Sequence, residues 1–129
     1  MSETMDPTLE KLGVGRITRH VFMCAGPKCC DGEQGQKAWE ALKSEIAAQG
    51  PGEGGGICFR TRVGCLRLCQ QGPVVLVYPE GTWYGGITAD RVPVLVQRHV
   101  REGVPVGEWV LAENPLPVAG PVVPLSGRS

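Results

Sequence analysis

The sequence predicts an α/β domain in which a four-stranded mixed sheet is flanked by helices. Two segments typical of strands, Ile17–Cys24 and Ile57–Val63, enclose a segment with helical periodicity, which is the order of a strand–helix–strand unit. An apolar run at Val74–Tyr78 is followed by a tight turn and a further strand, as in a hairpin. An amphipathic segment that begins near Asp90 adds a second helix.

The first strand, Ile17–Cys24, is rich in β-branched and aromatic residues, and the helix after it has marked ends. Asp31 can cap the first turn, with Gln34 three positions later as in a capping box. The helix is predicted to end at Gly50-Pro51, because glycine favours the left-handed C-terminal position and proline cannot continue the helix. Apolar side chains recur between these ends at three- and four-residue steps, at Trp39, Leu42 and Ile46.

A glycine-rich stretch at 52–56 leads into the second strand, Ile57–Val63. A dinucleotide-binding loop opens a helix, whereas this stretch precedes a strand, so we interpret it as a connector. The run Val74–Tyr78 is apolar throughout, as expected of a central strand that is covered on both faces. A turn at residues 79–81 then joins it to a partner strand predicted at Thr82–Ile87.

The second helix is predicted from about Asp90 to Gly103, with Val92, Leu95, Val96 and Val100 on one face. Pro93 fits only near its first turn, because a proline further along would remove a hydrogen bond and clash. A right-handed strand–helix–strand unit, a hairpin and a helix together give the thioredoxin-like architecture.

The chain has 129 residues, the size of one domain. Residues 17–113 contain all the predicted elements. Residues 1–16 are polar with scattered glycines and are expected to form a loose leader. Residues 114–129 are rich in proline and lack periodicity, so we expect a disordered tail.

Charge and hydropathy narrow the class of protein. The 13 basic and 13 acidic side chains cancel, which argues against a nucleic-acid partner, since such proteins carry a basic stripe. The N-terminal segment has no apolar core of a signal peptide, and no run of apolar residues is long enough to span a membrane. We therefore expect a cytoplasmic protein without membrane insertion, in which cysteines serve metal binding or redox chemistry.

The six cysteines form two groups and one outlier. The first group, Cys24, Cys29 and Cys30, follows the first strand. In the second group, Cys65 and Cys69 are four residues apart, so on one helical turn their Cβ atoms would lie roughly 5–6 Å apart. Both groups follow parallel neighbouring strands and emerge at the same end of the sheet. Two facing thiolate pairs could hold a two-iron cluster, with one iron on each pair.

The segments HVFMCAGPKCC, GCLRLCQQGPVVLVYPEGTWYGGI and HVREGVPVGEWVL resemble the thioredoxin-like [2Fe–2S] ferredoxins. This family is related to the small iron–sulfur subunit of respiratory NADH dehydrogenase. The resemblance implies an electron carrier that is not an enzyme, acts with redox partner proteins and forms a homodimer. It also implies a [2Fe–2S] cofactor with Cys24, Cys65 and Cys69 as ligands. Cys29 keeps the C-x4-C spacing and is favoured over the adjacent Cys30 as the fourth ligand.

Other uses of these cysteines are disfavoured by their spacing. A zinc-stapled interaction module would favour shorter C-x2-C steps, and a thiol–disulfide oxidoreductase needs a C-x-x-C at the start of the first helix. A Rieske centre needs two histidine ligands, but His20 and His99 lie in neither cysteine loop. Cys58 falls inside a strand and is expected to pack as a small apolar side chain.

Two questions stay open at the level of the sequence. The chain can be a free ferredoxin or an accessory electron-transfer subunit of a larger oxidoreductase. Cations near the cysteines can be ordinary solvated charges, or they can stabilise the reduced cluster and dock an acidic partner. These cations are Lys28, Arg60, Arg62 and Arg67.

Overall fold

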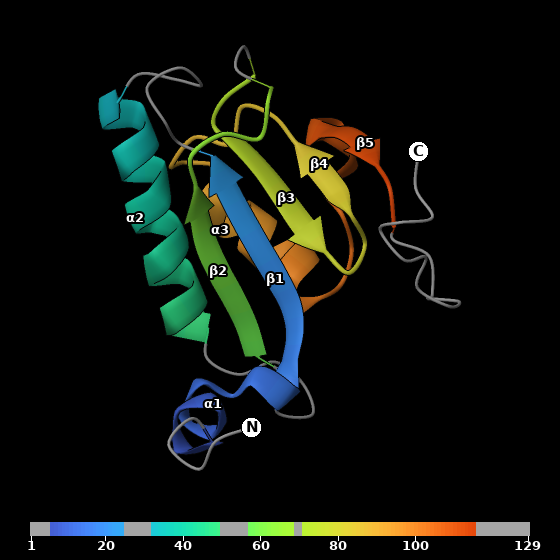
Figure 1. The fold of residues 1–129 in the computed structure, drawn as a ribbon. Helices are drawn as coiled ribbons and strands as arrows, with labels where there is room; N and C mark the ends of the chain where they lie inside the picture. Colours follow the sequence, from blue (N-terminus) through green and yellow to red (C-terminus); the bar gives the residue numbers. More distant parts are fainter. Residues whose placement is uncertain (1–5, 25–31, 50–56, 69–70, 116–129) are drawn as a thin grey trace, which may run out of the picture.

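The computed structural model describes residues 6–24, 32–49, 57–68 and 71–115, and its centre is a five-stranded sheet in the order β2-β1-β3-β4-β5 (Figure 1). β1 and β2 are parallel, and the other neighbouring pairs are antiparallel. The sheet is therefore mixed, and the predicted α/β class is confirmed. The strands are β1 (Ile17–Cys24), β2 (Ile57–Val63), β3 (Val74–Tyr78), β4 (Thr82–Tyr84) and β5 (Val110–Glu113).

The prediction of four strands was one short, because β5 adds to the free edge of β4. The Thr82 hydroxyl donates a hydrogen bond to Glu113 Oε2 at 3.2 Å, which reinforces the ladder. Pairing with β5 covers backbone groups that β4 would otherwise leave open. The four residues of β5 show little apolar alternation, so their pattern does not predict a strand.

β4 is shorter than the predicted strand at Thr82–Ile87. It ends at Tyr84, and the chain then leaves the ladder through Gly85 and Gly86. Gly86 has a φ of 62° and donates its N–H to the carbonyl of Gln71 at 2.7 Å. A left-handed residue cannot continue an extended strand, and this reorients the chain toward the next helix.

The helices beside the sheet are α2 (Gly32–Gln49), α3 (Val92–Leu95) and a continuing π-helical segment, η3 (Val96–Arg101). The first two helical predictions are thus confirmed, with Pro93 in the first turn of α3. Short 3₁₀ segments lie at Val14–Arg16 and Gly107–Trp109. The predicted loose leader contains a helix, α1 (Asp6–Leu12), which Gly13 closes in the left-handed conformation.

The predicted flanking of the sheet by helices is confirmed, and α2, α3 and η3 pack against one shared core. The core under them contains Val21 and Met23 of β1 with Ala38 and Leu42 of α2, and side chains of α3 and η3. In Figure 1 α3 lies behind the sheet and α2 lies beside its β2 edge, and no described helix lies in front of the strands. The opposite side, here called the open face, carries Phe22, Phe59, Leu76, Tyr78 and Trp83, which alternate with the core residues along their strands.

Candidate metal centre

Two of the predicted ligands lie at one end of the sheet. Cys24 is the last residue of β1, and it is paired with Val63, the last residue of β2. Gly64 and Cys65 follow directly. Because the two strands are parallel, their carboxyl ends bring Cys24 and Cys65 to the same edge, as the sequence predicts.

The contacts of the sulfur atoms show how close these segments come. The Cys24 thiol donates a weak hydrogen bond to the carbonyl of Gly64, with 3.8 Å from sulfur to oxygen. The backbone N–H of Arg67 donates to Cys65 Sγ at 3.2 Å. A thiolate that binds iron has no proton to donate but gains from such N–H donors, so the second contact suits a metal-bound sulfur.

The two cysteines differ in exposure. Cys24 is fully buried, and it packs in a small apolar group with Val74. Partly buried side chains complete this group: Val63, Leu66, Leu68 and Trp83. Cys65 lies at the surface. Beside it, an open groove of about 290 Å³ is lined by Leu66, Leu68, Trp83, Leu111 and Ala112.

The remaining candidate ligands, Cys29 (or Cys30) and Cys69, lie outside the described residues. Within the described part, no three His, Cys, Asp or Glu side chains come together as a metal site. The described pair nevertheless fits a thiolate-bound cluster. It offers soft sulfur donors, an N–H aimed at one sulfur and an apolar surround, and these features suit iron–sulfur coordination.

Comparison with known proteins agrees with this chemistry. A [2Fe–2S] ferredoxin of Aquifex aeolicus is 40% identical over 110 residues, which cover 77% of this chain and 94% of that one. One of Clostridium pasteurianum is 32% identical over 88 residues, covering 65% and 86% of the two chains. The chain belongs to the [2Fe–2S] ferredoxins. Its members carry electrons on a [2Fe–2S] cluster, so this cofactor and this role are those of the chain.

Comparison of the fold with solved structures indicates the same family. The structure of a thioredoxin-like [2Fe–2S] ferredoxin from Aquifex aeolicus superposes with a TM-score of 0.64 and 27% identity, over 77% of this chain and 96% of the other. The predicted thioredoxin-like architecture is therefore confirmed. No protein-family model matches the chain. In its described part, no helix combines the length and the hydropathy needed to cross a membrane.

Cys58 of this ferredoxin is placed as the sequence predicts. It is half-buried in β2 and packs against the core under the helices. Burial raises the pKa of its thiol to about 11, despite the opposing charges of Arg19 and Arg60. Burial thus favours the neutral thiol, which suits packing as a small apolar side chain.

The cations of β2 lie against α2. The Arg60 guanidinium stacks 5.9 Å from the centre of the Trp39 ring. Arg62 donates to Gln36 Oε1 at 2.9 Å. Both side chains are exposed, so they bridge strand and helix at the surface. Lys28 lies outside the described residues, and the exposed Arg67 lies beside Cys65.

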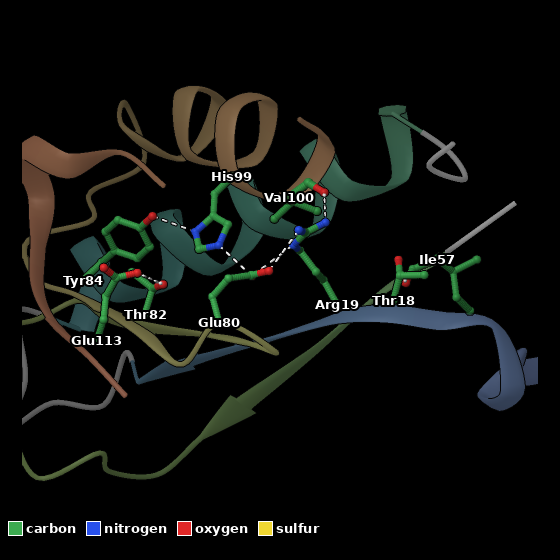
Figure 2. Close-up of polar contacts among 9 residues, drawn as sticks. All are labelled: Thr18, Arg19, Ile57, Glu80, Thr82, Tyr84, His99, Val100 and Glu113. Carbon is green, nitrogen blue, oxygen red and sulfur yellow. Dashed lines mark hydrogen bonds and ion pairs between the residues drawn. The ribbon is translucent and has the colours of Figure 1, made fainter. Parts of the chain in front are cut away.

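A second polar centre lies at the opposite end of the sheet, where Figure 2 shows Arg19, Glu80, His99 and Tyr84 in one chain of contacts. We call it the buried polar network. Arg19 holds Glu80 through two N–H donors at 3.0 and 3.1 Å and donates a third to the Val100 carbonyl at 3.2 Å. The Glu80 Oε1 atom also lies 2.9 Å from Nε2 of the fully buried His99.

The partners of His99 assign its proton. Tyr84 accepts the N–H of Val106 at 3.0 Å, and its hydroxyl lies 2.6 Å from His99 Nδ1. When the neutral His99 ring carries its proton at Nε2, the Tyr84 hydroxyl donates to Nδ1 and Nε2–H donates to Glu80. Both ring nitrogens then have a partner of the matching kind. Burial lowers the pKa of His99, although the Glu80 carboxylate opposes this.

Sequence patterns do not reveal this network. They place His99 within the second predicted helix and Glu80 in the predicted turn, whereas in the structure His99 is fully buried and contacts both Tyr84 and Glu80. Arg19 contacts Glu80 and Val100, which lie 61 and 81 positions further along the chain. No helical period or strand alternation relates such distant residues, and only folding brings them together.

Proposed function

We propose that this ferredoxin binds its cluster through the thiolates of Cys24, Cys29, Cys65 and Cys69. The observation that supports this most is the placement of Cys24 and Cys65 at the ends of neighbouring parallel strands. When bound, the cluster supplies a centre that accepts and releases one electron. Cys29 is preferred to Cys30 on its C-x4-C spacing from Cys24.

The chain's own residues would hold this centre from two sides. Cys24 is buried at the end of a central strand, which fixes one thiolate rigidly. Cys65 lies at the surface together with Arg67. A partner protein can therefore approach on the side of Cys65, where the path for the electron is short.

We further propose that the protein exchanges electrons with soluble redox proteins in the cytoplasm and catalyses no reaction of its own. The balanced charge of the chain favours protein partners over nucleic acid. Thiolate ligands also suit a reducing compartment, since an oxidising one would favour disulfides.

A homodimer is proposed as the assembled form, with a second copy on the open face. Phe22, Tyr78 and Trp83 lie there without a covering helix among the described elements, and an apolar sheet face of this kind favours association. Phe22→Arg should shift the molecular mass in sedimentation equilibrium from that of a dimer to that of a monomer. An unchanged mass would place the contact elsewhere.

Purification of the full chain under nitrogen tests the central proposal. We expect a brown protein with equal amounts of iron and inorganic sulfide. After reduction by one electron, the cluster should give an electron paramagnetic resonance signal. A colourless protein that binds zinc would refute it. Gel filtration of a lysate of the native host distinguishes a free ferredoxin from an accessory subunit, which would elute with a larger oxidoreductase.

A further inference from the structure

The chain has to cross the end of β1 on its way from β2 to β3, because these two strands lie on either side of β1 in the sheet. Cys24 is the last residue of β1. In the register of the sheet it is paired with Val63 of β2 on one side and with Val74 of β3 on the other. The segment that leaves Val63 and returns at Val74 therefore runs past Cys24.

Cys24 belongs to the open face and is nevertheless buried. Side chains alternate between the two faces of a strand, and Cys24 comes two residues after Phe22, which lies on the open face. No described helix covers that face (Figure 1). Cys24 and its neighbour Val74 are still fully buried, so something other than a described helix excludes water from them.

The segment after β2 supplies this cover. Within the described part of the chain, Leu66 and Leu68 are the side chains from outside the strands that pack on Cys24 and Val74. Both leucines are partly buried, whereas Arg67 between them is exposed. Two apolar side chains directed inward around one charged side chain directed outward are typical of a segment that lies on an apolar surface.

Hydrogen bonds hold the far side of this segment to the sheet. The carbonyl of Leu68 accepts the N–H of Gln71 at 3.1 Å, and the carbonyl of Gln71 accepts the N–H of Gly86 at 2.7 Å. Gly86 follows the end of β4. The segment is therefore continuous with β2 before the two leucines and joined to the chain beyond β4 after them.

We propose that Leu66 and Leu68 form an apolar lid that keeps water from Cys24 and holds Cys65 beside it. The lid makes the Cys24 side of the metal centre dry and leaves Cys65, the residue before Leu66, on the wet side. The two leucines are positioning residues, since they act through the ligands. The inference rests on the proposed function, because it takes Cys24 and Cys65 as ligands of the cluster.

The chemical consequence follows from charge and solvent. A thiolate-bound cluster becomes more negative when it accepts an electron, and water stabilises that negative charge. An apolar wall around a metal site limits the access of water and so affects its reduction potential. The lid over Cys24 therefore keeps the potential lower than it would be with water at this sulfur.

The reduction potential of the loaded full-length protein tests the lid. Leu66→Ala and Leu68→Ala open it, whereas Leu111→Ala shortens a side chain that lines the same groove but is outside the group on Cys24. Each lid variant should increase the equilibrium constant for electron uptake by roughly threefold to tenfold, because water gains access to the site. Leu111→Ala should have the potential of the parent. Lid variants with unchanged potentials, or an equal shift in all three variants, would overturn the proposal.

The access of water can also be measured directly. The reduced proteins are transferred to D₂O, and pulsed electron paramagnetic resonance records the deuterium modulation at the cluster. The modulation should deepen in Leu66→Ala and Leu68→Ala and stay at the level of the parent in Leu111→Ala. A parent protein without a cluster would refute the proposed ligands, whereas a loaded parent with lid variants of equal modulation would refute the lid alone.

Labelling of the cysteines separates an open lid from an unfolded chain. Iron is removed from the full chain with a chelator, and mass spectrometry follows the reaction of each thiol with iodoacetamide. Leu68→Ala should accelerate labelling of Cys24 by roughly fivefold or more through local opening. Labelling of Cys58, which packs in the core under the helices, should not change. If Cys24 of the parent reacts as fast as Cys65 while Cys58 stays protected, the lid is refuted. If Cys58 reacts as well, the chain has unfolded without iron, and the deuterium modulation of the loaded protein decides.

Discussion

The two ends of the sheet contrast in how their polar groups are satisfied. At the buried polar network, Arg19, Glu80, His99 and Tyr84 hydrogen-bond one another across β1, the β3–β4 turn, η3 and β4. At the thiolate end, Cys24 and Cys65 each hydrogen-bond a backbone group, the carbonyl of Gly64 and the N–H of Arg67. One end uses side chains to join distant segments, and the other uses two strand ends to present sulfur.

This difference indicates that the two ends have different roles. A buried network with complete hydrogen bonding rigidifies the elements that it joins. Soft sulfur donors instead leave their coordination to a metal, which then contributes to the stability of that end. Substitutions at the thiolate end should therefore alter cluster content or reduction potential. Substitutions in the buried polar network should alter the free energy of unfolding and leave the visible spectrum unchanged.

The largest effect is expected from the ligands. Cys24→Ala and Cys65→Ala should each abolish or strongly reduce cluster incorporation, because alanine supplies no donor to iron. Cys69→Ala and the double variant Cys29→Ala/Cys30→Ala should behave alike. The measurement is iron and sulfide content with the visible spectrum. Cys58→Ala is the control and should keep a normal cluster, since this side chain packs in the core.

The buried polar network gives the opposite readout. Tyr84→Phe removes the hydroxyl between His99 Nδ1 and the Val106 N–H. Leaving two buried groups unpaired should lower the free energy of unfolding by about 1–3 kcal/mol. Urea unfolding measures this, and the visible spectrum should stay that of the parent protein. A shifted reduction potential would mean that the two ends are coupled.

Mild acid should weaken the buried polar network. Burial lowers the pKa of His99 from its ordinary 6.5, so the unfolded chain binds more protons and stability falls as the pH drops below about 6.5. Burial by itself raises the pKa of Glu80, but hydrogen bonds from Arg19 and His99 outweigh it and hold the pKa below its ordinary 4.5. The contribution of Glu80 is therefore lost at lower pH still.

Urea unfolding of the parent protein and His99→Gln between about pH 8 and pH 5.5 tests this assignment. The variant should be less stable at pH 8, with a flatter decline toward pH 5.5. Burial also lowers the pKa of His20, which hydrogen-bonds Thr61 at 2.7 Å on the open face. His20→Gln is thus the matched control. A decline that flattens only in this control would move the acid sensitivity from the network to the open face.

The smallest effect is expected at the C-terminus. Asn114 donates its N–H to Gly81 at 2.8 Å beside the network, so the packed part reaches this residue. Removing residues 116–129, which were predicted from composition to form a tail, should leave melting temperature and cluster content nearly unchanged. A melting temperature lowered by several degrees would extend the packed part beyond Pro115.

The sequence by itself determined the order and type of the main elements. Alternation and β-branched runs located β1, β2 and β3, and the period of Trp39, Leu42 and Ile46 located α2. Local patterns suffice there because each element buries one face in the core, which imposes its own period on the residues. The spacing of the cysteines likewise predicted that two of them meet at one end of the sheet.

Only the tertiary structure decided what depends on distant partners. β5 forms because β4 offers it an edge, and the helices gather on one face because their apolar sides share one core. The network joins Arg19 to Glu80, 61 positions apart in the chain, so no local period reveals it. A hydrogen bond between remote residues leaves no periodic trace in a sequence, since folding alone sets the distance between them.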